Sequence, residues 1–531
     1  MATKIEVYDT TLRDGVQQEG MNLSVADKMA IAPLLDELGV DVIEGGWPGA
    51  IPKDTEFFAL AHKELELAHA ALAAFGSTRK AGVAVGKDAQ VKALLDSEAP
   101  IVTLVAKSDI RHVERALKTT AEENLAMVRD TVALLVEEGR RVILDAEHFF
   151  AGYFVDPDYA ISVLRAAVEA GADTIVPCDT NGGMLPDDVT RIVGEVRDAN
   201  LGVAIGMHAH NDSGCAVANT MAAVAAGATQ VQGCINGYGE RTGNADIVAV
   251  AANLELKRDA VAFRKGCLAE ATRITHAISE ITNIAPFARQ PYVGLSAFAH
   301  KGGLHASAIR VDPDLYQHTQ PEKVGNDMRM VVSEMAGRSS IELKGKELGF
   351  DLKGQAELLG RVTDRVKAAE AEGYTFDAAD ASFEMLLLEE MGEAPQYWET
   401  EGWKVAVETS PGDPTEALAE ASVALTAAGK RVQASGEGNG PVNALDHALR
   451  TAVQGLYPEI AKFELTDYKV RIMEASHGTD AVTRVLITTT HTDTGDSWRT
   501  VGVGPNIIEA SWEALTAALA YGLLHAGVKE G

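Results

Sequence analysis

Short apolar runs alternate with longer segments of helical periodicity over the first part of the chain. This alternation is typical of repeated βα units, in which strands separated by helices pair in parallel. We predict eight strands, at Ile5–Tyr8, Val40–Ile43, Ala73–Phe75, Ile101–Val105, Arg141–Leu144, Thr174–Val176, Ala204–Met207 and Gln230–Cys234. Eight strand–helix pairs within about 280 residues indicate an α/β fold, a (β/α)8 TIM barrel, with an open doubly wound sheet as the alternative.

Polar residues cluster directly after nearly every predicted strand. The clusters are Asp9–Asp14, Glu44, Glu147–His148, Asp179–Asn181, His208–Asp212 and Asn236–Asn244. A closed barrel gathers the carboxyl ends of its strands around one pocket. The clusters therefore favour the barrel over the open sheet and predict a functional site at that end.

The βα alternation stops near residue 290. A Gly/His segment, Phe298–His305, and acidic helical stretches such as Gly354–Gly373 indicate a helical connector. Further on, strands are predicted at Val405–Val407, Ser422–Leu425, Tyr468–Met473, Arg484–Thr490 and Trp498–Val503, and helices at Val442–Val453 and Ile507–Leu523. We therefore expect three parts: a catalytic barrel at 1–285, helical connector subdomains at 286–400, and at 401–531 a C-terminal α+β domain of two similar halves.

Composition and charge exclude several classes of protein. Hydrophobic residues make up 46% of the 531 residues and charged residues 23%, which predicts a globular chain with large cores. A net charge of −30 repels phosphate backbones and anionic lipid heads, so we expect neither a nucleic-acid nor a membrane partner. The 4 cysteines form no CxxC pair, and no export signal or long apolar run is present, so we expect a cytoplasmic protein.

The His-Ala-His of His208 and His210 ends a predicted strand, where a period of two directs both imidazoles to one side. This is metal-ligand spacing, although two polar residues at a barrel mouth would show the same pattern. Asp14 follows the first strand and Asn244 the eighth, and these strands adjoin in a closed barrel. Two nitrogen and two oxygen donors suit a divalent metal such as Mg²⁺, Mn²⁺ or Zn²⁺.

Three motifs carry a family resemblance. Asp9–Gly20, His208–Asp212 and Gly237–Asn244 resemble the DRE-TIM metallolyase superfamily. Within that superfamily, Phe298–Ala306 is similar to the segment after the barrel in 2-isopropylmalate, homocitrate and citramalate synthases. Gly438–Val442 and Val501–Ala510 resemble the allosteric domain of these enzymes.

The resemblance implies a Claisen-type condensation. The methyl group of acetyl-CoA loses a proton and attacks the ketone of a 2-oxo acid, and the thioester is then hydrolysed. A divalent metal on Asp14, His208 and His210, with Asn244 as a weaker ligand, would chelate the oxo acid. Arg13 would bind the substrate and donate to the oxygen that becomes negative, or would form only a structural ion pair.

The resemblance also implies further site residues. Glu147 matches the catalytic glutamate, for which a dry pocket and a raised pKa are expected. His305 matches a histidine that often comes from the partner subunit, and Tyr316 the tyrosine near it. Either Glu147 or His305 is the enolising base, unless His305 is only a helix-cap residue. The Thr180 hydroxyl would bind the carboxylate of the oxo acid or cap the next helix.

The 2-oxo acid is inferred from local sequence. Asp145–Phe150 replaces the FSPED-like stretch of isopropylmalate synthases, and with Glu44–Pro48 it looks most like the longer bacterial citramalate synthases, whose substrate is pyruvate. A 2-isopropylmalate synthase using 2-oxoisovalerate is the alternative. A carbon–carbon lyase and a non-catalytic amino-acid sensor remain further alternatives.

The C-terminal domain implies regulation. By resemblance, glycine-rich turns such as Gly436–Gly440 line an amino-acid effector site. Because a citramalate pathway from pyruvate leads to isoleucine, the expected inhibitor is isoleucine, or else leucine. A domain that only dimerises is the alternative. A homodimer is expected because His305 would complete a neighbouring subunit's pocket.

Overall fold

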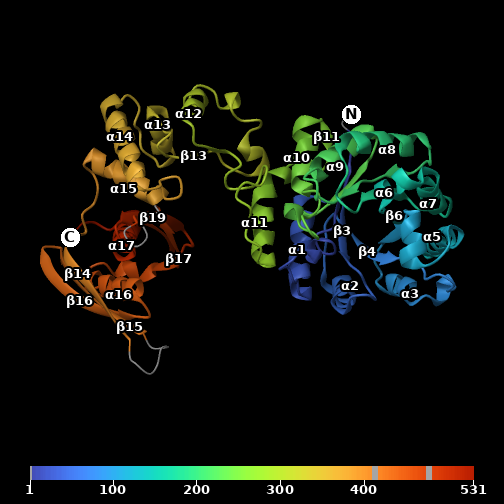
Figure 1. Ribbon diagram of the computed structural model, residues 1–531, viewed down its shortest axis with the longest axis horizontal. Coiled ribbons are helices and arrows are strands. Elements are labelled where there is room, and N and C mark those ends of the chain that lie inside the picture. The colour runs from blue at the N-terminus through green and yellow to red at the C-terminus, as the bar shows by residue number, and fades with distance from the viewer. Residues whose placement is uncertain (1–2, 410–416, 474–480, 531) are drawn as a thin grey trace. The chain divides into compact units, whose positions relative to one another are not determined.

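The computed structural model describes residues 3–409, 417–473 and 481–530 (Figure 1). The chain forms two compact units, one of residues 1–298 with 319–327 and one of residues 299–318 with 328–531. The three-part division at residues 285 and 400 stays a prediction.

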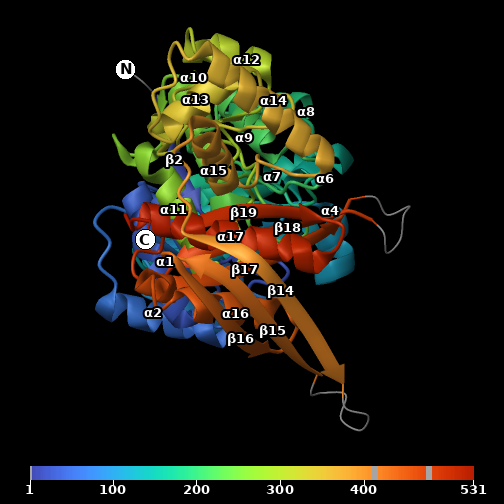
Figure 2. The same cartoon turned by 90° about the vertical axis from the view of Figure 1, so that its left-hand side faces the viewer.

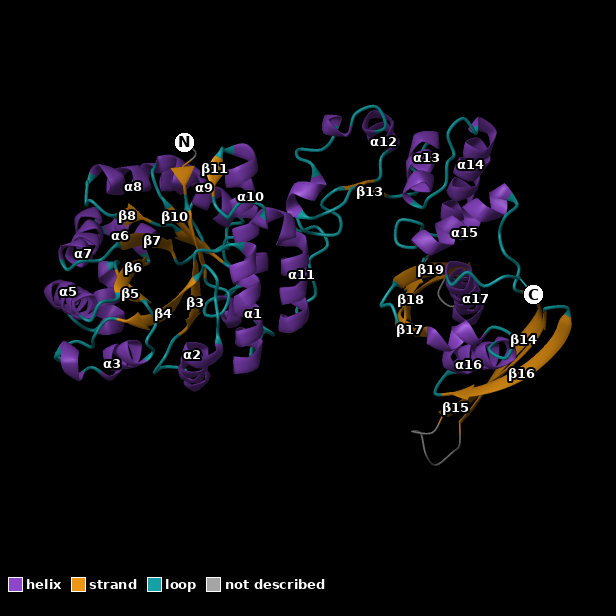
Figure 3. Ribbon diagram, turned by 180° about the vertical axis from the view of Figure 1, so that it is seen from behind, coloured by secondary structure: helices purple, strands orange, loops and turns teal. Residues whose placement is uncertain are grey.

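The first unit is a closed parallel barrel, which confirms the (β/α)8 fold and excludes the open sheet. From β2 to β7 each strand pairs with the next, β9 pairs with both β7 and β10, and β10 pairs in parallel with β2, which closes the ring (Figure 3). The strands are β2 (Glu6–Asp9), β3 (Val42–Gly46), β4 (Ala71–Ser77), β5 (Ile101–Lys107), β6 (Arg141–Glu147), β7 (Thr174–Asp179), β8 (Ala204–Ile205), β9 (His208–Ala209) and β10 (Gln230–Gly233).

The seventh predicted strand is divided into β8 and β9, which both pair with β7. The interruption includes Gly206, where a Cβ atom would come within 2.8 Å of Gln230 Oε1 and Val176 Cγ2. Only glycine allows the backbone this close approach. The strand resumes at His208, which lies opposite Gln232 of β10.

An outer layer of helices surrounds the strands. These helices are α1 (Val25–Leu38), α2 (Pro52–Glu64), α3 (Ala89–Asp96), α5 (Ala121–Glu137), α7 (Pro157–Glu169), α8 (Pro186–Asp198), α9 (Ala216–Ala226) and α10 (Ile247–Lys257). Shorter or later elements of this unit are β1 (Thr3–Lys4), α4 (Ile110–His112), α6 (Phe149–Val155), β11 (Ala260–Val261) and α11 (Ala271–Thr282). The main core lies between helices and strands, and Tyr8, Val42, Ile143 and Val176 form a separate cluster inside the barrel.

The second unit begins with the connector, which is helical as predicted. Its helices are α12 (Gly303–Ile309), α13 (Arg338–Glu347), α14 (Ala356–Glu372) and α15 (Asp380–Met391), with a short pair of strands, β12 (Ala299–His300) and β13 (Arg329–Met330). Val362, Phe376, Phe383 and Leu387 belong to a core of its own.

The C-terminal part repeats a pattern of three antiparallel strands and one helix, which confirms the two similar halves (Figure 2). The first half contains β14 (Trp398–Thr409), β15 (Ala417–Ala427), β16 (Lys430–Gly438) and α16 (Pro441–Val453). The second contains β17 (Phe463–Ile472), β18 (Thr483–His491), β19 (Ser497–Gly504) and α17 (Ile507–His525). The sequence did not indicate β16, because this edge strand is almost without large apolar residues.

Among the described residues, α17 alone is long and apolar enough to cross a membrane by length and composition. Half of its apolar window is buried, and Ala514, Leu515 and Leu519 lie in the core of the C-terminal part. The helix packs on β18 and β19. We therefore interpret α17 as a core helix.

Candidate active site at the barrel mouth

A cavity of about 480 Å³ lies at the carboxyl ends of the barrel strands. This volume is in the range of small-molecule sites in proteins. Six residues singled out from the sequence line it together: Arg13, Asp14, Glu147, Thr180, His208 and His210.

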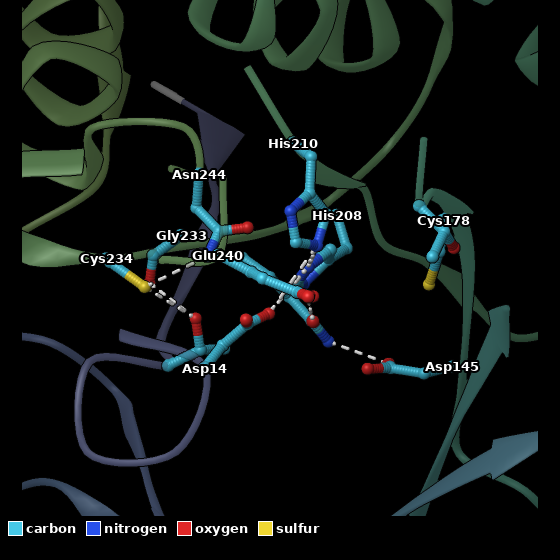
Figure 4. A network of polar contacts seen from close by, with 12 residues as sticks. Asp14, Asp145, Cys178, His208, His210, Gly233, Cys234, Glu240 and Asn244 are labelled. Carbon is cyan, nitrogen blue, oxygen red and sulfur yellow. Dashed lines mark hydrogen bonds and ion pairs between the residues drawn. The ribbon is translucent and has the colours of Figure 1, made fainter. Parts of the chain in front are cut away.

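Asp14, His208 and His210 form a compact cluster in the cavity wall (Figure 4). Asp14 follows β2 in a turn in which the Thr10 carbonyl accepts hydrogen bonds from the Arg13 and Asp14 amides. Asp14 Oδ2 lies 3.2 Å from His208 Nε2 and 3.7 Å from His210 Nε2. One ligand atom from each of the three residues lies within 4.8 Å of the others, which is close enough for one metal ion.

Unpaired polar atoms show that the cluster suits a cation. Among the described residues, no group hydrogen-bonds the buried Oδ1 atoms of Asp14 and Asn244. The Asn244 amide nitrogen donates to the Tyr238 carbonyl at 3.2 Å, and Figure 4 shows the amide oxygen on the side of His210. Buried acceptors without donors are costly, and a divalent cation would satisfy both.

The charges in the cluster leave a carboxylate and one neutral imidazole for a cation. Burial raises the pKa of Asp14, but the opposite effect of Arg13 and the two imidazoles is larger. The pKa of Asp14 is therefore well below its usual value. Burial and the neighbouring His208 lower the pKa of His210 to about 4. Burial lowers the pKa of His208, but Asp14 raises it above its usual value. The carboxylate is therefore charged and one imidazole is neutral at pH 7.

Arg13 is fixed on three sides. Its guanidinium pairs with the buried carboxylate of Glu44, lies 3.3 Å from Asp14 Oδ2 and stacks 3.8 Å from the centroid of the Phe75 ring. The Tyr8 hydroxyl donates to Glu44 at 2.9 Å and so holds the partner carboxylate. The ion pair expected as the alternative role is present, yet Arg13 also lines the cavity.

Glu147 lies in a wetter place than expected. Its side chain is 25% exposed and forms an ion pair with Lys107, and His148 Nε2 is 3.9 Å from its carboxylate. The barrel unit by itself therefore does not form the dry pocket expected from the sequence, and the catalytic role of Glu147 stays a prediction. The pairing of Lys107 with Glu147 could not be predicted from the sequence, because it depends on the register between β5 and β6.

The Thr180 hydroxyl oxygen accepts a hydrogen bond from the His148 amide at 2.8 Å. The hydroxyl proton remains available to a ligand, because Thr180 lines the cavity. The next helix, α8, has Leu185 at its N-cap, so Thr180 does not cap it.

His305 and Tyr316 lie in the second unit. Their rings stack with centroids 4.1 Å apart, and Tyr316 is 45% exposed. The N-cap of α12 is Gly302, so His305 is not a helix-cap residue. The barrel unit by itself thus gathers the predicted metal ligands, Arg13, Glu147 and Thr180, but neither of these two.

Sequence reasoning missed several polar residues of the site. Gln232, on β10, accepts a hydrogen bond at its Oε1 from His208 Nδ1 at 2.9 Å, and its amide nitrogen donates to Asp145 at 3.0 Å. Burial raises the pKa of Asp145 to about 7, with Glu44 adding to the rise while His208 opposes it. The available signal was the alternation of Gln230, Val231 and Gln232, which places two amides on one face of a buried strand.

Known families match consecutive parts of the chain. The HMGL-like family model matches residues 4–282, and the homocitrate synthase post-HMGL domain-like model matches residues 292–373. The model of the LeuA allosteric (dimerisation) domain matches residues 377–523.

Curated relatives match nearly the full length. The chain is 61% identical to an (R)-citramalate synthase of Streptomyces coelicolor, over 98% of this chain and 97% of the relative. It is 47% identical to an (R)-citramalate synthase of Synechocystis, with 98% and 97% covered. It is 33% identical to a probable 2-isopropylmalate synthase of Methanopyrus kandleri, with 97% of each covered.

Proposed function

The chain belongs to the HMGL-like family, and from this premise we propose that it is a metal-dependent acyltransferase that condenses acetyl-CoA with pyruvate to give (R)-citramalate and CoA. The observation that supports this most is the cluster of Asp14, His208 and His210 in a cavity shared with Arg13. Full-length similarity to (R)-citramalate synthases supports pyruvate as the oxo acid.

The donor set fits Mg²⁺, Mn²⁺ or Zn²⁺, held by Asp14, His208 and His210 with Asn244 as the fourth ligand. A cation bound there supplies Lewis acidity towards the ketone and carboxylate oxygens of the oxo acid. The chain's own groups hold the substrate around it. The Thr180 hydroxyl donates to the oxo-acid carboxylate, and the Arg13 guanidinium donates to the oxygen that becomes negative.

The proposed reaction consumes one water. Glu147 or His305 takes a proton from the methyl group of acetyl-CoA, and the carbanion forms a bond to the ketone carbon of pyruvate. The ketone oxygen becomes an alkoxide, against which Arg13 is fixed by Glu44 and Phe75, and it is then protonated. Water cleaves the thioester, which releases CoA and leaves the second carboxylate of citramalate.

We propose that regulation and assembly belong to the second unit. A cavity of about 810 Å³ in the C-terminal part is lined by Asn439, Gly440, Asp446 and Arg450 beside the glycine-rich turn. We assign this cavity to isoleucine, or else leucine, as feedback effector of isoleucine biosynthesis.

The exposed Leu304 and Leu315 beside His305 and Tyr316 support a homodimer in which this segment is covered. All four cysteines are free thiols, which supports a reducing, cytoplasmic location.

Release of free thiol tests this function. Purified protein is freed of metal and mixed with acetyl-CoA, Mg²⁺ or Mn²⁺, and pyruvate, 2-oxoisovalerate or 2-oxoglutarate in turn. We expect metal-dependent thiol release that is fastest with pyruvate. Faster release with 2-oxoisovalerate would support the 2-isopropylmalate synthase alternative. Cleavage of citramalyl-CoA without condensation would support a lyase, and no reaction with any acid would support the amino-acid sensor.

A further inference from the structure

A line of polar side chains runs through the barrel from the amino ends of the strands to the metal-ligand cluster. Arg141 and Glu6 form an ion pair at the start of β6 and β2. Gln230 and Gln232 follow on β10, with 1% and 0% of their surface exposed, and His208 ends the line.

Glu6 sets the direction of the first amide. Its carboxylate accepts from Arg141 at 2.6 and 2.9 Å and from Gln230 Nε2 at 2.6 Å. Burial raises the pKa of Glu6, but the hydrogen bonds from Arg141 and Gln230 outweigh it and lower the pKa. An ionised carboxylate only accepts hydrogen bonds, so the NH2 group of Gln230 must face Glu6. The Gln230 oxygen then faces Gln232.

The second amide is oriented in the same sense. Gln232 Nε2 lies 3.4 Å from Gln230 Oε1, which can only accept, and donates to Asp145 Oδ1 at 3.0 Å, so the NH2 group faces both. The Gln232 oxygen is left 2.9 Å from His208 Nδ1. An amide oxygen cannot donate, so His208 must carry a proton on Nδ1.

A neutral imidazole with its proton on Nδ1 presents a lone pair on Nε2. In His208 this is the atom 3.2 Å from Asp14 Oδ2 and 3.4 Å from His210 Nε2. We propose that Gln232, oriented by Asp145 and Gln230, is a positioning residue that fixes His208 with the lone pair of Nε2 facing the cation site. The inference rests on the metal site of the proposed function. Groups of this kind around metal ligands typically change metal affinity by about 10- to 100-fold.

The test must separate the hydrogen bonds of Gln232 from the packing of its side chain. Gln232→Met keeps the length of the side chain and removes both hydrogen bonds. The double variant Gln232→Glu with Asp145→Asn keeps one carboxyl group in the pair and keeps the direction of the bond to His208, because the carboxylate introduced at position 232 accepts from His208, while the amide introduced at position 145 donates to that carboxylate. Thr220→Val is the control, since among the described residues that buried hydroxyl bonds only to the Ala216 carbonyl of its own helix, α9.

The readout is equilibrium binding of Mn²⁺, followed by the electron paramagnetic resonance signal of the free ion. We expect Gln232→Met to weaken binding about 10- to 100-fold, and the double variant to return to within about threefold of the unaltered chain. The control should bind as the unaltered chain does. Unchanged affinity in Gln232→Met overturns the inference, and so does a double variant as weak as Gln232→Met. No Mn²⁺ binding by the unaltered chain overturns the metal site itself.

If Gln232→Met does not fold, the position of the proton on His208 can be measured in the unaltered chain. Metal-free protein labelled with ¹⁵N-histidine is examined by solid-state NMR at about pH 9, well above the usual imidazole pKa of about 6.5. His208 is assigned as the resonance lost in His208→Asn. A proton on Nδ1 supports the inference, and a proton on Nε2 overturns it.

Discussion

The barrel mouth and the α12 segment carry the two halves of the proposed chemistry in opposite environments. Asp14, His208 and His210 are 2–5% exposed and are held by contacts within the barrel unit. On the α12 side, Leu304 is 83% exposed and Tyr316 45%. The metal half is therefore preorganised within one folding unit, whereas the half that contains His305 needs a further surface to exclude water.

The largest effect is expected from breaking the preorganised half. Asp14→Asn removes the only carboxylate among the ligands, and we expect thiol release to fall by at least about 10⁴-fold, since a Lewis acid supplies several kcal/mol. The measurement is thiol release with pyruvate at saturating Mg²⁺. Asp198→Asn, an exposed surface carboxylate paired with Arg197, should leave the rate unchanged. Activity within tenfold of the unaltered chain in Asp14→Asn would contradict the assignment.

Arg13→Lys tests the fixed donor beside the metal ligands. Lysine keeps the charge but cannot bond Glu44 and stack on Phe75 as a planar guanidinium does. We expect kcat to fall by about 10²- to 10³-fold, as for loss of one donor to a developing oxyanion. Mn²⁺ affinity should change little, and Arg197→Lys on the surface is the control. A fall in affinity that accounts for the whole loss would show that Arg13 acts only on the metal site.

His305→Ala sharpens the contrast between the two halves. Loss of an acid or base costs about 10²-fold or more in kcat, while Mn²⁺ binding in the barrel should be unchanged.

Mixed subunits test whether His305 completes the cavity of its own chain or that of the partner. If it completes the partner's cavity, Asp14→Asn and His305→Ala chains that are refolded together should recover roughly a quarter of full activity, because half of the dimers are mixed and each has one complete site. No recovery would place both residues in one chain's site.

The smallest effect is expected in the second unit. The hydrogen bond that Glu384 accepts from the imidazole raises the pKa of His525 against the effect of burial, so the folded pKa exceeds the unfolded value of about 6.5. The His525–Glu384 pair therefore contributes its full stabilisation of the folded state below about pH 6.5. This contribution is lost as the pH rises through the pKa of His525 in the folded state. His525→Phe should lower the free energy of unfolding by less than about 1 kcal/mol at pH 5.5, because the side chain is half exposed, and should not lower it at pH 9. The measurement is Tm at both pH values. The substitution should have no pH-dependent effect in a Glu384→Gln background.

The sequence predicted the residues whose position follows from strand order. Asp14 and His208 come at the ends of the first and seventh strands, and barrel closure brings those ends together. Lys107 and Gln232 could not be assigned roles, because their contacts depend on side-chain direction and on register between strands. The edge strand β16 was missed because its alternating small and polar residues give no apolar run.

An anomalous diffraction map from crystals grown with Mn²⁺ tests the central claim most directly. We predict one strong Mn²⁺ peak in the barrel cavity, within about 2.0–2.4 Å of Asp14 and both imidazole Nε2 atoms, with Asn244 Oδ1 beside it. A peak at another site, or none between Asp14, His208 and His210, would contradict the account.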